Sequence, residues 1–278
     1  MIVQSASPGK PHFVITMNDH TALAGAFARA FGNSEVEPVE PAEIMYFLVE
    51  NHDRGWDAWD QAPALDPLTR LPYSLMRTPL DALLKTNAGS PDFCGLHHPY
   101  CGLLSSMHTT GLYNGRFGLS HHIALDHLAE TARAPVQAML TAESARRRQL
   151  KARLLANPVT ARWLEEAHLM QNYKQLQFFD TLALYFNLNH AGERQIAQFP
   201  HVPRTAHHDI EIEITPTVEG HYRLSPWPFA GDRFEVSFHG RYLRPLARGD
   251  DATDAATALN EAAEAEQILR LIPGLIPG

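Results

Sequence analysis

The sequence predicts a mainly α-helical fold with a small antiparallel β-sheet formed by N- and C-terminal strands. Two observations lead to this prediction. Between residues 21 and 187, apolar side chains recur every three to four positions, which is the spacing of helices with one buried face. Near both ends of the chain, short runs alternate apolar and polar residues instead, which is the period of half-buried strands. Strands that flank a helical region can meet in one sheet against it.

The N-terminal part of the chain is expected to contain a hairpin and two helices. The hairpin strands flank the turn-rich segment SASPGKP. Each helix has apolar residues at helical spacing and stops near a glycine. A stretch rich in proline and aromatic residues then indicates a loop. The expected bounds are 1–4 and 12–17 for the strands, 21–31 and 42–53 for the helices, and 56–79 for the loop.

The middle of the chain is expected to be helical, and the part after residue 209 is expected to form strands. The strand segments are DIEIEITP, HYRLSP and RFEVSFHGRYL, which glycine and proline turns separate. An alanine-rich acidic tail indicates a surface helix. The expected helices span 100–113, 124–157, 160–187 and 250–267. We divide the chain into a helical domain with its N-terminal hairpin, 1–195, and a β-rich appendage, 196–278, packed on the same core.

Composition excludes several classes of function. The formal net charge is -8 at pH 7, which argues against a nucleic-acid partner, because such partners are held by clustered Lys and Arg. No apolar run is long enough for a membrane helix and no secretory signal is evident, so we expect a soluble, cytoplasmic, bacterial protein. Cys94 and Cys101 are expected to be free. The oligomeric state stays open, with a homodimer as one option.

The unusual feature of the composition is histidine, with 16 residues, because histidine is the commonest side-chain metal ligand. His20, His52 and His108 each continue an apolar helical stripe, so they should point inward. Asp53 follows His52 directly, and Asp180 lies in the apolar run FFDTLALYF, where an unpaired carboxylate is costly. A satisfied core histidine, or a buried Arg or Lys beside Asp180, would also explain each residue alone. A divalent metal, Fe, Mn or Zn as one or two ions, explains all five together.

The order of these residues resembles a known ligand pattern. His20, then His52-Asp53, then His108, then Asp180 looks like the H…HD…D pattern of the HD-domain metal-dependent phosphohydrolase superfamily, which implies an HD-like helical bundle. More closely, the stretches MNDHTALAG, NHDRGWDAWDQAPALDP, LLSSMHTTGLY and YKQLQFFDTLALYFN resemble an uncharacterised bacterial family of unknown function. The superfamily's two-metal members use two further histidines. The candidates for that role, besides His108, are His97, His98, His121 and His122.

Other residues are candidates for contacts with a substrate. Arg116 lies between glycines, where its guanidinium could reach inward to bind a phosphate or carboxylate, and Lys174 is a second cation for an anionic substrate. The alternative without a functional role is that the two cations are solvated at the surface and that the aromatic residues contribute only to packing. The aromatic residues that could line a substrate pocket are Trp56, Trp59, Tyr73 and Tyr113.

The predicted function is a metal-dependent hydrolase, acting on a phosphate ester with metal-activated water. Asp53 would orient the water or accept its proton, with Arg116 and Lys174 assisting. The resemblance leaves a second reaction open, a di-iron oxygenase of the HD type acting on a small substrate. A non-catalytic module, in which the metal stabilises a ligand-binding fold, is the third hypothesis.

Overall fold

The computed structural model describes residues 1–247 and 255–274. Its centre is a seven-stranded sheet with the order β1-β2-β6-β7-β5-β4-β3. Neighbouring strands are antiparallel except β5 and β7, which are parallel. The strands are β1 (Ile2–Val3), β2 (His12–Ile15), β3 (Ala197–Thr205), β4 (His208–Pro216), β5 (Tyr222–Ser225), β6 (Phe234–Leu243) and β7 (Glu264–Pro273).

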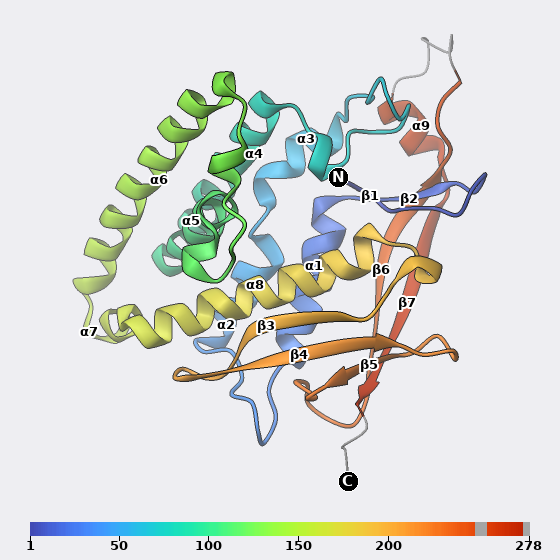
Figure 1. Ribbon diagram of the computed structural model, residues 1–278. Helices are drawn as coiled ribbons and strands as arrows, with labels where there is room; N and C mark the ends of the chain where they lie inside the picture. Colours follow the sequence, from blue (N-terminus) through green and yellow to red (C-terminus); the bar gives the residue numbers. More distant parts are fainter. Residues whose placement is uncertain (248–254, 275–278) are drawn as a thin grey trace.

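Most of the helices form successive layers on one side of this sheet (Figure 1), whereas α9 packs with Val14 of β2 and Leu243 of β6 in a separate apolar cluster. α1 and α8 contact the sheet directly, α2 and α5 pack on them, and α4 and α6 lie outermost. The main core fills the space between the sheet and the inner helices. The helices are α1 (Met17–Ala30), α2 (Ala42–Asn51), α3 (Asp57–Gln61), α4 (Leu80–His97), α5 (Pro99–Asn114), α6 (Glu130–Leu155), α7 (Pro158–Ala161), α8 (Glu166–Leu188) and α9 (Ala255–Glu261).

The expected fold class is wrong. About half of the described residues are helical, and the curled, mixed sheet spans both chain ends, so the fold is not an HD-like helical bundle with a small antiparallel sheet. The expected fold class is wrong because the sheet contains two strands, β3 and β7, that the sequence pattern did not predict. The sheet contains strands from both of the expected domains, 1–195 and 196–278. The division of the chain into these two domains stays a prediction.

The hidden strands have physical explanations. β3 contains Pro200 and Pro203, which break the strand pattern, but β3 lies at the edge of the sheet, where a missing N–H is tolerated. β7 begins in the alanine-rich tail that was expected to be helical to residue 267. Only Ala255–Glu261 is helical there, and residues 250–254 of the expected helix lie outside the described residues. Ile268 and Leu269 pair with β6, because strand pairing outweighs a weak local helix preference.

The central helix α5 is buried on nearly every side. Small residues allow this close packing. A Cβ added to Gly102 would lie 2.7 Å from Gly95 Cα on α4, and one added to Gly111 would lie 2.0 Å from the Tyr173 hydroxyl oxygen on α8. The helix ends at Gly115, which adopts the left-handed conformation with φ of 72°. α5 therefore brings its side chains into contact range of α2, α4 and α8 together.

No helix among the described residues combines the length and the apolar character needed to cross a bilayer.

Candidate metal centre

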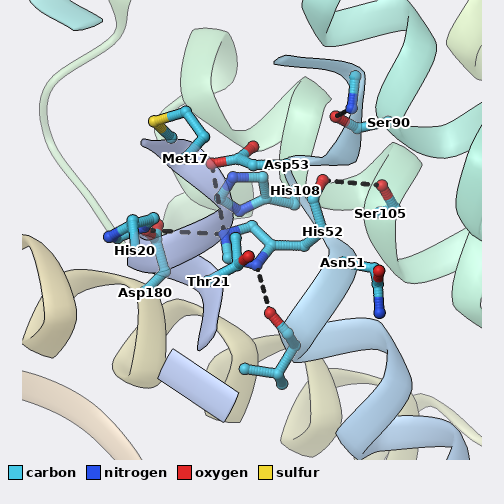
Figure 2. Close-up of polar contacts among 12 residues, drawn as sticks. Met17, His20, Thr21, Asn51, His52, Asp53, Ser90, Ser105, His108 and Asp180 are labelled. Carbon is cyan, nitrogen blue, oxygen red and sulfur yellow. Dashed lines mark hydrogen bonds and ion pairs between the residues drawn. The ribbon is translucent and has the colours of Figure 1, made fainter. Parts of the chain in front are cut away.

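The five predicted ligands converge on one buried place in the helical layers. His20 comes from α1, His52 and Asp53 from the end of α2, His108 from α5 and Asp180 from α8. Figure 2 shows the rings of His52 and His108 beside the carboxylates of Asp53 and Asp180, with His20 next to Asp180. The sequence prediction that these helices turn their polar groups toward one another is consistent with this arrangement.

The end of α2 explains how two adjacent residues reach the same place. On a continuous helix their side chains would point about 100° apart. Here α2 ends at Asn51, and Asp53 adopts φ of -111° and ψ of 21°, which turns the chain. Ser105 on α5 donates a hydrogen bond to the carbonyl oxygen of His52, at 3.5 Å. A Cβ on Gly55 would lie 2.1 Å from the carbonyl oxygen of Thr86, so only glycine permits this close approach to α4.

The spacing of the polar atoms suits a metal ion. His20 Nε2 lies 3.2 Å from Asp180 Oδ1, and His52 Nε2 lies 3.8 Å from the same oxygen and 3.6 Å from Asp53 Oδ2. Ligand atoms about 2.0–2.3 Å from one ion are separated by roughly 3–4 Å. Two overlapping sets have all their ligand atoms within 4.8 Å of one another. These are His20, His52 and Asp53, and His52, His108 and Asp180.

Each imidazole is held at Nδ1, which leaves Nε2 for the centre. His20 Nδ1 donates to Asn187 Oδ1 and His52 Nδ1 donates to the Val49 carbonyl oxygen, both at 2.8 Å. His108 Nδ1 lies 2.8 Å from Gln177 Nε2, an amide donor, which puts the proton of neutral His108 on Nε2. A metal at His108 Nε2 therefore requires the Gln177 amide to be turned so that Oε1 accepts from Nδ1–H. Metal-binding histidines are usually oriented by such a contact on their second nitrogen.

The hydrogen bonding of two histidines of the centre is unusual for buried groups. His52 Nε2 is buried with no hydrogen-bond partner among the described residues. His20 lies between two acceptors, Asn187 Oδ1 and Asp180 Oδ1. Either both His20 nitrogens carry protons, or a cation lies between Nε2 and the carboxylate. Polar groups buried this deeply are rarely left without a partner, so His52 Nε2 is the atom at which a proton or a metal ion would be accommodated.

The electrostatics of the centre favour positive charge. Burial lowers the pKa of His52, but the carboxylates of Asp53 and Asp180 outweigh burial and raise that pKa to about 9. Burial also works to raise the pKa of Asp180, yet the hydrogen bond from His20 and the nearby imidazoles of His52 and His108 hold that pKa well below its usual range. A proton on His52 and a metal ion therefore compete for the same nitrogen. His108 differs, because burial dominates and lowers its pKa to about 4.

Solvent reaches the centre at Asp53. Its side chain is 15% exposed, compared with 6% for Asp180 and 0% for His20 and His52. Asp53 is therefore the ligand candidate best placed to contact a water molecule that enters from outside.

The two predicted substrate-binding cations line a pocket together with Gln177. Arg116, Lys174 and Gln177 line a pocket of about 200 Å³ between α8, β3 and the turn after α5. Lys174 Nζ donates to Asp209 Oδ2 at 2.6 Å, so its charge is already neutralised. Arg116 makes no ion pair with another described residue. Gln177 therefore connects this pocket with the metal centre, because it lines the pocket beside Arg116 and contacts His108.

The predicted aromatic residues have packing contacts. Trp56 is buried in the main core, and Trp59 lies against Tyr73 with ring centroids 6.4 Å apart. Tyr113 belongs to a separate apolar cluster and accepts a hydrogen bond from Asn87 at 2.9 Å. Their role in substrate binding stays a prediction.

The additional histidines do not join either ligand set among the described residues. His97 ends α4 and stacks on Phe47, and His98 caps the N-terminus of α5. His121 and His122 are exposed in the segment after α5.

Sequence reasoning missed the residues that orient the histidines. Gln177 and Asn187 are buried on α8, three residues before and seven residues after Asp180. This spacing places all three on one face of the helix. A stripe of polar residues in an otherwise apolar helix was the signal that could have identified them.

The comparisons with known proteins give one finding. Residues 1–245 match the model of a family described as "Protein of unknown function (DUF3891)". No curated protein and no solved structure matches the chain. The family match confirms the resemblance to an uncharacterised family and gives no support to an HD-domain likeness. The chain belongs to the DUF3891 family of proteins of unknown function.

Proposed function

We propose that the protein is a metal-dependent hydrolase of a phosphate ester, with one divalent ion held among His20, His52, Asp53, His108 and Asp180. The observation that carries the proposal is that candidate ligand atoms of three imidazoles and two carboxylates lie within 4.8 Å of one another in two overlapping sets, with the Nδ1 atoms of His20 and His52 already engaged as donors. Imidazole and carboxylate together suit Zn, Fe or Mn.

A single ion fits the ligand supply better than two. The two overlapping ligand sets share His52, and its Nδ1 donates to a backbone carbonyl, so only Nε2 can bind a metal. Two ions would have to compete for that nitrogen. Because His52 offers only one nitrogen, we propose one ion, whose charge the carboxylates of Asp53 and Asp180 offset.

When bound, such an ion lowers the pKa of a coordinated water and polarises an ester oxygen. Asp53, as the most exposed of the five side chains, is placed to orient the attacking water and to accept its proton. Arg116 carries an unpaired positive charge near His108 and could bind the anionic group of the substrate. The proposed roles are therefore ion binding for the buried residues and water activation for Asp53.

The test uses protein purified without chelators. Elemental analysis should give about one transition-metal ion per chain, and a panel of phosphomonoesters and phosphodiesters should reveal hydrolysis that a chelator abolishes. Asp53→Asn should lower kcat at least about 100-fold. The matched control is Asp57→Asn, because Asp57 is a partly exposed carboxylate paired with Arg54. Equal rates for wild type and Asp53→Asn would rule out the proposed role.

A structural metal site is the second candidate, because four of the five residues are almost fully buried. Catalytic sites keep one coordination position open, whereas structural sites are closed. A stoichiometric ion whose removal unfolds the protein, with no hydrolysis across the ester panel, would favour this candidate over the hydrolase.

A further inference from the structure

A second pocket lies away from the metal centre, at the end of the sheet that carries the N-terminal hairpin. It has a volume of about 430 Å³ and is bounded by the β1–β2 loop, the segment after α8, and strands β5, β6 and β7. In Figure 1 this region lies where the hairpin approaches β6 and β7. A volume of this size is within the range of small-molecule sites.

The pocket contains a buried arginine whose charge no carboxylate neutralises. Arg194 is 6% exposed and makes no ion pair with any described residue. Its hydrogen bonds go to neutral oxygens only. Nε donates to the Asn189 carbonyl, Nη2 to the Phe186 carbonyl and to Gln267 Oε1, and Nη1 to the Tyr222 hydroxyl. A buried cation without a counter-charge is costly, so the arrangement favours an anion.

Two donors remain available at this place. A guanidinium has five N–H groups, and the bonds above use four of them, which leaves one hydrogen on Arg194 Nη1. The Tyr222 hydroxyl accepts from that same Nη1, and its own hydrogen is directed to no acceptor recorded among the described residues. Two adjacent unused donors suit the oxygens of one carboxylate.

The rest of the pocket carries a second cation and apolar rings. Lys10 also lines it, and none of the described lining residues is Asp or Glu, although the chain as a whole is acidic. Phe13 and Tyr242 lie together on the wall, with ring centroids 4.9 Å apart. An apolar body could pack against these rings while its acid group meets Arg194.

We propose that this pocket binds a small organic carboxylate with an aromatic or other apolar body, its carboxylate against Arg194 and Tyr222 and its body against Phe13 and Tyr242. A phosphate group fits less well, because three charged oxygens need more donors than the two that are free. The site is independent of the metal centre and of the proposed hydrolase activity.

The test is an NMR chemical-shift titration of the full chain with three probes. Benzoate carries the acid and the ring, benzamide carries the ring without the charge, and inorganic phosphate carries charge without the ring. We expect benzoate to bind at least about tenfold more tightly than benzamide and more tightly than phosphate.

Two matched variants locate the site. Tyr222→Phe removes one proposed donor and keeps the ring, and it should weaken benzoate binding about tenfold. Tyr185→Phe is the control, because its hydroxyl donates to the Gln195 carbonyl and does not line the pocket. Circular dichroism confirms that both variants are folded.

Several results would overturn the proposal. These are the absence of benzoate binding, equal affinity for benzoate and benzamide, tighter binding of phosphate, or unchanged benzoate affinity in Tyr222→Phe. None of these results depends on bound metal, so they are distinct from failure of the proposed hydrolase.

Discussion

The affinity of the centre for a divalent ion should depend steeply on pH between 7 and 9. In the metal-free protein the pKa of His52 is raised to about 9, so His52 is protonated at pH 7. Metal binding requires the neutral imidazole and must therefore release that proton. With the pKa two units above pH 7, about one molecule in a hundred has neutral His52. The apparent affinity should rise about 50-fold from pH 7 to 9 and reach a plateau about 100-fold above its pH 7 value at higher pH.

The assay is competition for Zn²⁺ against a chromophoric chelator, with the proton equilibria of the chelator and buffer taken into account. Calorimetry at pH 7 in two buffers of different ionisation enthalpy should show the release of about one proton per ion. His190→Gln is a suitable control, because that histidine lies outside the ligand sets and should leave the profile unchanged.

Asp53→Asn provides the diagnostic comparison. Asp53 is the largest contribution that raises the pKa of His52, so its removal should move the inflection of the affinity profile to lower pH. This shift is separate from the loss of affinity that follows from losing a ligand. A flat profile between pH 7 and 9 in wild type, or an inflection at the same pH in Asp53→Asn, would refute the reasoning.

Three further predictions concern the surroundings of the centre and the packing of α5. Gln177→Leu removes the contact to His108 Nδ1 and should weaken metal binding about 10–100-fold in the chelator competition. Burial lowers the pKa of His108 to about 4, so the stability that its neutral form provides is present above pH 6.5 and lost as the pH falls through 4. Urea unfolding of metal-free protein should show a loss of about 3 kcal/mol across this range, and His108→Gln should reduce it. Gly102→Ala places a Cβ 2.7 Å from Gly95 Cα and should lower the free energy of unfolding by about 1–3 kcal/mol.

Two of these three predictions have a matched control variant. Gln171→Leu changes another buried glutamine of α8, which bonds Glu37 instead of a histidine, and it should keep metal affinity. Gly95→Ala adds a Cβ whose nearest neighbouring atom is 3.8 Å away, which is an ordinary van der Waals distance. It should therefore lower the free energy of unfolding much less than Gly102→Ala. Equal effects within either pair, or a pH dependence that His108→Gln leaves unchanged, would contradict the corresponding prediction.

The sequence indicated the helices whose buried faces are apolar and missed the one whose buried face is polar. α1, α5 and α8 were expected within a few residues of their observed positions. α4 was missed because its buried face includes Thr86, Asn87 and Ser90, and because Pro91 lies inside it. Apolar periodicity cannot identify such a face.

The inward-facing residues of the centre could be recognised, but the fold around them could not. A carboxylate in the apolar run of α8, such as Asp180, indicates a buried site whatever the surrounding architecture. The order of the ligand residues along the chain suggested a bundle, yet four helices can bring the same residues together on a sheet of seven strands. The partners of the imidazoles, Gln177 and Asn187, depend on helix packing, and local sequence does not reveal that packing.

The position of β7 has a consequence for how the protein is made. β7 comes after every other described strand in the sequence, yet it lies inside the sheet between β6 and β5. Until β7 has left the ribosome, the other strands form two separate groups, β1-β2-β6 and β5-β4-β3. The edges of β6 and β5 that β7 will join are unpaired during that time. We expect the nascent chain to complete its sheet only after β7 has emerged, with those edges exposed to other chains until then.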